Sequence, residues 1–266
     1  MISPDHSGRG PTFLAWAWLL ILLCLAVTAR SQPADPSEFV RRATVAYQLT
    51  RAQFQSATNG SPAAWQFARA CYNLADFATN DSTRADLALQ GIEASRKLIK
   101  ETPQSGPAHY YLGMNLGQLA RTELLGALTL VREMETEFKT AWGLDQQVDH
   151  AGAARSLGLL YRDAPGWPTS LGSQRKAREW LDRANHASPD FPENPLVLAE
   201  SHLLWGEPVL AGEKVKELDL LWPHARTNFT GQAWEHDWAD WTARRVAAEK
   251  RLADQTTPPA HPPRHG

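Results

Sequence analysis

The chain has 266 residues, which is enough for one or two domains with a hydrophobic core and too many for a mini-protein held by disulfides. Its 27 Lys and Arg residues nearly balance its 29 Asp and Glu residues, so the net charge of -2 provides no basic field to attract nucleic acid. With 43% hydrophobic and 21% charged residues, the composition excludes a disordered, collagen-like or coiled-coil chain, and 11 Trp is an unusually large number.

Residues 1–29 have the layout of a signal peptide. Arg9 precedes an unbroken apolar run from Phe13 to Val27, which at 15 residues is shorter than the ~20 residues of a spanning helix. The small residues that follow predict cleavage after Ala29 and export to the periplasm. The alternative is an uncleaved anchor, in which case the chain contacts a membrane only through this segment.

The two cysteines argue against a lipid anchor and against a disulfide. Cys24 follows Leu23, whereas a lipidation site has a small residue at that place. Removal of the signal peptide leaves Cys71 as the only cysteine, so no intramolecular disulfide can form. Aromatic and alanine neighbours predict that the Cys71 thiol is buried and unreactive.

The main part of the chain is predicted to be all-helical. Between Asp35 and Gln255 apolar residues recur at three-four spacing, and no stretch alternates as a half-buried strand would. The clearest predicted helices cover Phe39–Phe54, Thr83–Lys100 and, with a bend near Thr122–Gly126, Ala108–Trp142. The predicted parts are a signal peptide at 1–29, irregular helical hairpins at 30–103, TPR-like repeats with a capping helix at 104–255, and a disordered Pro-rich tail at 256–266.

A 34-residue repeat identifies the architecture as a tetratricopeptide-like (TPR-like) α-solenoid of antiparallel helical hairpins. Small residues let paired helices approach closely, and the proline of each copy is expected to end the second helix. The two clear copies are Ala177, Leu181, Ala184 and Pro189, followed by Ala211, Val215, Leu218 and Pro223. First helices of about four repeats are indicated by Leu112-Gly113, Leu157-Gly158 and Leu198-Ala199, and by Ala64-Trp65 for a further copy.

Three tryptophans mark the end of the domain. Trp234, Trp238 and Trp241 have the spacing of one helix face and predict a C-terminal capping helix over the last repeat. The alternative is a cage of indole rings for a sugar or an apolar ligand.

The repeat is interrupted between Tyr161 and Ala177 by a loop with Trp167 at its centre. One interpretation is a ligand-contacting loop, and the other is that Trp167 folds back to fill a gap in the core. Just upstream, Asp149 is expected to cap a helix, and His150 beside it is expected to be a solvated residue at the helix start, with a role as a general base as the alternative.

No catalytic or metal-binding pattern is present in the sequence. It contains no G-x-S-x-G, no phosphate-binding loop and no CxxC, and the one pair of histidines four residues apart, His261 and His265, lies in the Pro-rich tail. Glu235, His236 and Asp237 are consecutive, so on a helix they point in different directions. We therefore expect a protein without enzymatic activity, cofactor or metal.

Residues 105–222 resemble the TPR-like T components of TRAP transporters and their uncharacterised bacterial relatives. The resemblance rests on Leu157-Gly158 with Tyr161, on the loop Ala164-Pro165-Gly166-Trp167-Pro168, and on Pro192-Glu193-Asn194 leading into Leu198-Ala199-Glu200. It implies a periplasmic helical protein that forms a ring-like homo-oligomer and assists a periplasmic solute-binding protein in the uptake of small organic ligands.

The predicted function is a non-enzymatic scaffold in the bacterial cell envelope that binds another protein against its concave face. The residues predicted to contact the partner are Tyr110, Asn115, Arg155, Arg162 and Asn194. The alternative is a small-ligand-binding or pore-forming transport component, with a cavity around Trp167 and Trp205.

Overall fold

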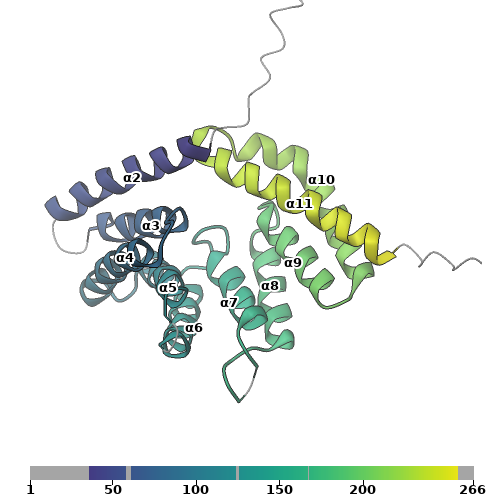
Figure 1. Ribbon diagram of the computed structural model, residues 1–266, viewed down its shortest axis with the longest axis horizontal. Coiled ribbons are helices and arrows are strands. Elements are labelled where there is room, and N and C mark those ends of the chain that lie inside the picture. Colours follow the sequence, from purple (N-terminus) through teal and green to yellow (C-terminus); the bar gives the residue numbers. More distant parts are fainter. Residues whose placement is uncertain (1–35, 58–60, 124–125, 167, 257–266) are drawn as a thin grey trace, which may run out of the picture. The chain divides into compact units, whose positions relative to one another are not determined.

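The predicted all-α class is confirmed by the computed structural model of the protein, which describes residues 36–57, 61–123, 126–166 and 168–256 (Figure 1). These residues form ten α-helices, and no strand occurs among them. The predicted signal peptide and nearly all of the predicted disordered tail lie outside the described residues. None of the described helices is both long and apolar enough to cross a membrane.

The helices pack as hairpins in chain order, with one helix before the hairpins and one after them (Figure 1). α2 (Pro36–Ser56) lies against the first hairpin, and α11 (Glu235–Thr256) packs on the last one after a short 3-10 helix, η1 (Gln232–Trp234). The four hairpins are α3 (Ala63–Asp76) with α4 (Asp81–Glu101), α5 (Gly106–Ala120) with α6 (Ala127–Leu144), α7 (Gly152–Asp163) with α8 (Gln174–Ala187), and α9 (Glu193–Leu204) with α10 (Pro208–Asn228).

Two glycines set the spacing within hairpins. A Cβ added to Gly158 of α7 would lie 2.5 Å from Cδ2 of Leu181 in α8. A Cβ on Gly113 of α5 would lie 2.5 Å from Cε1 of Phe138 in α6. The Leu-Gly pattern of the sequence therefore marks the points where the helices of a hairpin approach most closely.

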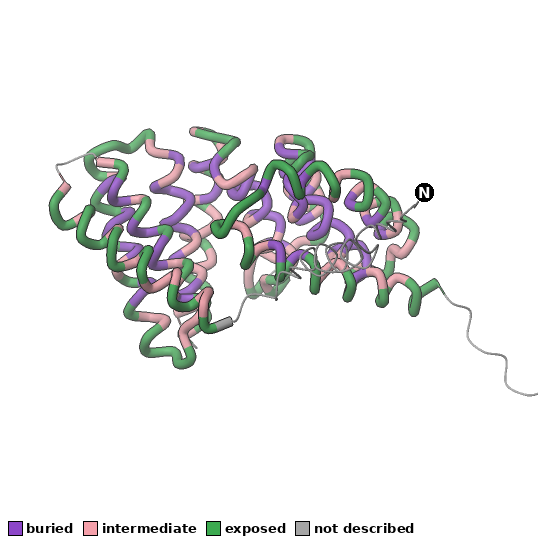
Figure 2. Tube along the Cα trace, turned by 90° about the horizontal axis from the view of Figure 1, so that it is seen from above, coloured by how far each residue is buried: buried purple, intermediate pink, exposed green. Residues whose placement is uncertain are grey.

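The residues of the 34-residue repeat occupy equivalent core positions in α8 and α10. Their side chains are buried: Ala177, Leu181 and Ala184 in the first copy, and Ala211, Val215 and Leu218 in the second. Buried residues follow the facing sides of the helices, while exposed residues occupy the outer turns (Figure 2).

One expectation about the repeat is wrong, because Pro223 does not end its helix. α8 does end before Pro189, but α10 contains Pro223 and continues to Asn228. A proline inside a helix removes a backbone hydrogen bond. The five residues beyond Pro223 offset this cost, because they bury Ala225 and lead into the buried Phe229.

An aromatic cluster joins the capping helix to the last hairpin. Trp238 and Trp241 are buried against Phe191 and Phe229, and Nε1 of Trp238 donates a hydrogen bond to the carbonyl oxygen of Phe229 at 2.6 Å. The capping helix is thus confirmed, with Trp238 and Trp241 packed into the last hairpin. Trp234 differs from the prediction, since it precedes α11 and lies in η1.

The first and last described helices contact each other (Figure 1). Arg42 of α2 forms an ion pair with Glu235 of α11 at 2.6 Å and donates a hydrogen bond to the carbonyl oxygen of Gln232 at 2.9 Å. The imidazole of His236 packs edge-on against Phe39 at 5.0 Å and Phe77 at 5.3 Å between ring centroids. This set of contacts is called the α2–α11 contact below.

Cys71 is buried, as the sequence predicts, and burial raises the pKa of its thiol to about 12. Because the thiolate is the reactive form, we expect iodoacetamide at pH 8 to modify Cys71 only after the protein is unfolded in urea. Peptide mass mapping separates Cys71 from Cys24 and measures this. Rapid modification of Cys71 in the folded protein would contradict the buried position.

Candidate functional site

Two polar residues expected to contact a partner are buried between hairpins. The Tyr110 hydroxyl donates a hydrogen bond to Oδ2 of Asp149 at 2.7 Å. Nδ2 of Asn115 donates to the carbonyl oxygens of Ala68 at 2.9 Å and Tyr111 at 2.7 Å. These side chains join neighbouring helices, so a partner cannot reach them without unpacking the repeats.

Arg155 and Asn194 are likewise buried instead of facing a groove. Nη1 of Arg155 donates to Oδ1 of Asn194 at 3.0 Å, and Nη2 lies 3.2 Å from Oδ2 of Asp149. Nε lies 3.4 Å from a Glu193 carboxylate oxygen, and Arg244 of α11 reaches the same Glu193 at 3.2 Å. The result is a charged network that connects α5, α7, α9 and α11.

The structure describes two of the other three predicted contact residues, Arg162 and Trp205, and each contacts a neighbouring side chain. Nη1 of Arg162 donates to the Ser201 hydroxyl at 3.1 Å, and its Nε forms an ion pair with Asp163 at 2.6 Å. Trp205 is half-buried, with the Arg178 guanidinium 4.8 Å from its ring centroid. Trp167 lies outside the described residues, so its two interpretations stay predictions.

A pocket of about 320 Å3 lies elsewhere, and we call it the α3–α5 pocket. It is formed by α3, α5, the segment 145–150 that precedes α7, and η1. Its lining residues are Trp65, Arg69, Pro107, Tyr111, Asp145, Gln147, Val148, Asp149, His150 and Trp234. The volume lies at the lower end of the range for small-molecule sites, and it also suits one large side chain of a partner.

Aromatic rings form two sides of the α3–α5 pocket. The Trp65 and Tyr111 rings stack with centroids 5.9 Å apart and planes 6° apart. His150 stacks on Phe191 at 4.4 Å and lies 5.8 Å from Trp234. Such surfaces favour a flat or apolar group between them.

The segment at the base of the pocket has an unusual backbone. Asp149, His150 and Ala151 have φ angles of 50°, 54° and 64°, so three consecutive residues without a glycine are left-handed. Each costs about 1–3 kcal/mol unless neighbouring contacts hold it. Here the Asp149 carboxylate binds Tyr110 and Arg155, and Ala151 precedes α7. The expectation that Asp149 caps this helix is wrong, because its side chain faces the core network.

Some of the ionisable side chains that line the pocket are paired within the protein, and others are not. Asp149 is neutralised by Arg155 and Tyr110. Burial lowers the pKa of His150, which keeps the imidazole neutral at pH 7. Arg69 and Asp145 are exposed, and neither forms an ion pair with any residue that the structure describes. The pocket therefore presents one positive and one negative group, and these do not neutralise each other.

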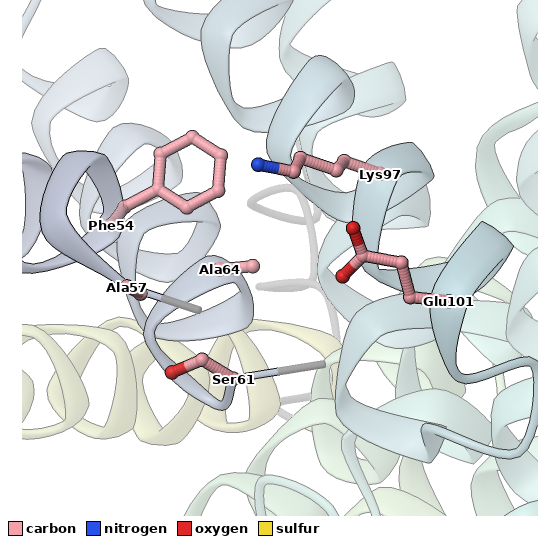
Figure 3. Close-up of a pocket in the computed structure, with 6 residues that line it drawn as sticks. All are labelled: Phe54, Ala57, Ser61, Ala64, Lys97 and Glu101. Carbon is pink, nitrogen blue, oxygen red and sulfur yellow. The ribbon is translucent and has the colours of Figure 1, made fainter. Parts of the chain in front are cut away.

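A second hollow, between α2, α3 and α4, is too small for a ligand (Figure 3). Its volume is about 10 Å3, which is roughly the space of one water molecule. The Lys97 ammonium points across it toward the Phe54 ring, 5.2 Å from the ring centroid. In the described part of the chain no group of three His, Cys, Asp or Glu residues could hold a metal. These observations leave the α3–α5 pocket as the candidate site.

None of the six predicted contact residues that the structure describes lines the α3–α5 pocket. The available signal was Trp65 and Arg69, which are four residues apart and therefore share a face of α3. Tyr111 and Trp234 lie far from both in the sequence, so their convergence depends on the packing of hairpins and on η1.

His109 provides a pH-dependent contact between α5 and α6. Nδ1 lies 2.6 Å from Oε2 of Glu137, and Nε2 lies 3.0 Å from the carbonyl oxygen of Pro103. Both partners accept hydrogen bonds, so both ring nitrogens donate in the protonated form, and the Glu137 hydrogen bond raises the pKa of His109.

Because the folded-state pKa lies above the unfolded value of 6.5, the His109 contribution is fully present below pH 6.5 and is lost as pH rises through the folded-state pKa. We expect His109→Gln to lower the free energy of unfolding by about 1.5 kcal/mol at pH 5.5 and by less at pH 8.5. Urea denaturation at both pH values measures this, and Glu137→Gln is the matched variant. A larger loss at pH 8.5 would contradict it.

The fold and the pocket define a solenoid of helical hairpins with a recess suited to binding. Residues 33–138 match the family described as regulator of microtubule dynamics protein 1-3. The match covers α2 to α5 and part of α6, less than half of the chain, and so includes Trp65, Arg69 and Tyr111 of the pocket. A comparison with curated proteins finds no match.

Proposed function

We propose that this chain is a non-enzymatic scaffold that binds a segment of another protein, with one side chain of that segment anchored in the α3–α5 pocket. The observation that carries the proposal is the 320 Å3 recess beside the stacked Trp65 and Tyr111 rings. Partner binding commonly depends on a large side chain that fills such a recess.

The polar groups nearest the pocket support binding over catalysis. Asp149 is held by Tyr110 and Arg155, and His150 packs in an aromatic cluster with its pKa lowered by burial. A catalytic base would need a free acceptor aimed at a nucleophile, and here the carboxylate is already hydrogen-bonded on Oδ2.

The setting that we propose is the bacterial cell envelope, with a role accessory to TRAP-type solute uptake. The signal-peptide layout of residues 1–29 and the resemblance of residues 105–222 support it. The match to the regulator of microtubule dynamics family covers residues 33–138 and is independent of this proposed setting.

The test is selection of binding peptides from a random peptide library with the full chain as bait. We expect enriched peptides with a large apolar residue, and Trp65→Ala should weaken their binding at least tenfold, since an aromatic anchor contributes about 2 kcal/mol or more. Trp180→Ala is the matched control, because Trp180 is also half-buried but does not line the pocket.

Thermal unfolding of both variants shows that they are folded before binding is compared. No enrichment on the folded chain would contradict the proposal. Equal binding by Trp65→Ala and Trp180→Ala would contradict the place of the anchor.

A second candidate function is small-ligand binding, favoured by the volume of the pocket and by its aromatic sides. If this second function is correct, a small molecule should copurify with the protein. Native mass spectrometry of the full chain would show a bound mass of a few hundred daltons that Trp65→Ala loses.

A further inference from the structure

We propose that the α3–α5 pocket recognises a flat apolar group that carries both a carboxylate and an ammonium or guanidinium group. The proposal rests on the proposed function only in placing the ligand in the same pocket. It is based on the charged side chains that line the pocket and form no ion pair with any described residue.

Two of the ionisable side chains at the pocket are already satisfied by the fold. The carboxylate of Asp149 accepts from Tyr110 at 2.7 Å and from Arg155 at 3.2 Å. His150 stacks on Phe191 and is half-buried. Neither offers a free charge to a ligand.

Arg69 supplies the positive charge. It lies one turn after Trp65 on α3, so guanidinium and indole lie on the same face of the helix. Burial raises the pKa of Tyr111, and the positive charge of Arg69 opposes that rise, which fits a guanidinium near the Tyr111 ring. Arg69 is exposed and has no ion-pair partner in the described part of the chain.

Asp145 supplies the negative charge from the segment that follows α6. One of its carboxylate oxygens accepts the backbone N–H of Gln147 at 2.9 Å, which holds the side chain in place. The carboxylate is otherwise free of ion pairs within the described residues, and it lines the same pocket as Arg69. A ligand with only a negative charge would satisfy Arg69 and be repelled by Asp145, whereas a ligand with both charges satisfies both residues.

This chemistry has two sources, a free aromatic amino acid and a peptide segment in which acidic and basic side chains flank an aromatic one. The volume of about 320 Å3 admits one aromatic ring in either case. The shared requirement is a pair of opposite charges beside the ring.

The test measures binding to the full chain by titration calorimetry with three probes that share one ring. Phenylalanine carries both charges, 3-phenylpropionate only the carboxylate, and phenethylamine only the ammonium. We expect phenylalanine to bind about fivefold more tightly than either analogue, since an exposed charge pair contributes up to about 1 kcal/mol. Its advantage should shrink in 1 M salt.

Two variants assign each charge. Arg69→Gln should weaken phenylalanine and 3-phenylpropionate about fivefold, and it should not weaken phenethylamine, whose ammonium loses a repelling charge. Asp145→Asn should weaken phenylalanine and phenethylamine about fivefold without weakening 3-phenylpropionate, and it keeps the side-chain oxygen that accepts the Gln147 N–H. Lys216→Gln, on the exposed side of α10, is the matched control and should change nothing.

A capped tripeptide of glutamate, phenylalanine and lysine distinguishes the sources from each other. Tighter binding by the tripeptide than by phenylalanine assigns the pocket to a peptide segment, and the reverse order assigns it to a free amino acid while contradicting the proposed anchor role. Both orders support the inference if Arg69→Gln and Asp145→Asn weaken the binding.

Three results would overturn the inference: equal binding of the three probes, no binding of any probe or tripeptide to the folded chain at millimolar concentration, or equal behaviour of Arg69→Gln and Lys216→Gln. The proposed function fails separately, when library peptides do not bind or do not depend on Trp65. Uncharged library peptides that depend on Trp65 would leave the proposed function intact and refute the charge requirement.

Discussion

Replacing Arg155 with methionine is expected to lower the free energy of unfolding by about 3 kcal/mol. Arg155 is 5% exposed, and its guanidinium lies between Asp149, Glu193 and Asn194. Methionine keeps much of the volume, but the two carboxylates lose their shared positive charge and Asn194 loses a donor. The left-handed segment at Asp149 loses one of the contacts that hold it.

Urea denaturation measures the effect, and Arg162→Met on the same helix is the matched control. Arg162 pairs with the exposed Asp163, so its replacement should cost about 1 kcal/mol or less. If both variants lose the same stability, the Arg155 network contributes no more than a surface ion pair.

Gly158→Val is expected to destabilise the protein by about 3 kcal/mol through overpacking. A Cβ at this position would lie 2.5 Å from the Leu181 side chain and 3.1 Å from the Leu181 backbone nitrogen. The side chain can rotate, but the backbone of α8 can move only if the hairpin of α7 and α8 opens.

The matched variant for this prediction is Gly143→Ala in α6. An added Cβ there meets no atom within 4 Å, and alanine favours a helix over glycine. Gly143→Ala should therefore raise the thermal midpoint slightly while Gly158→Val lowers it by several degrees. A tolerated valine at position 158 would show that the α7–α8 spacing is adjustable.

Much of the fold could be predicted because local signals agree with the packing. The Leu157-Gly158 pattern and the copies at Ala177 and Ala211 are set by contacts between neighbouring helices, and these contacts impose a fixed spacing in the sequence. The prediction that Pro223 ends its helix is wrong because burial of the residues beyond Pro223 outweighs the local preference of proline to break a helix.

The candidate site was harder to predict, because polar residues in a solenoid look alike in the sequence whether they face a groove or join two helices. Asn115 and Arg155 have polar side chains, yet backbone carbonyls and carboxylates from other helices surround them. The pocket combines α3 with a segment near residue 150 and with Trp234, which no periodic pattern connects.

The α2–α11 contact gives the repeat array a property that open arrays lack. In an open array each unit touches only its neighbours, so the terminal units fray first and unfolding spreads inward. Here Arg42 and Glu235, which are 193 positions apart, form an ion pair, and His236 packs against Phe39 beside it. Fraying of either end therefore removes support from the other, and the two ends open together as one cooperative step.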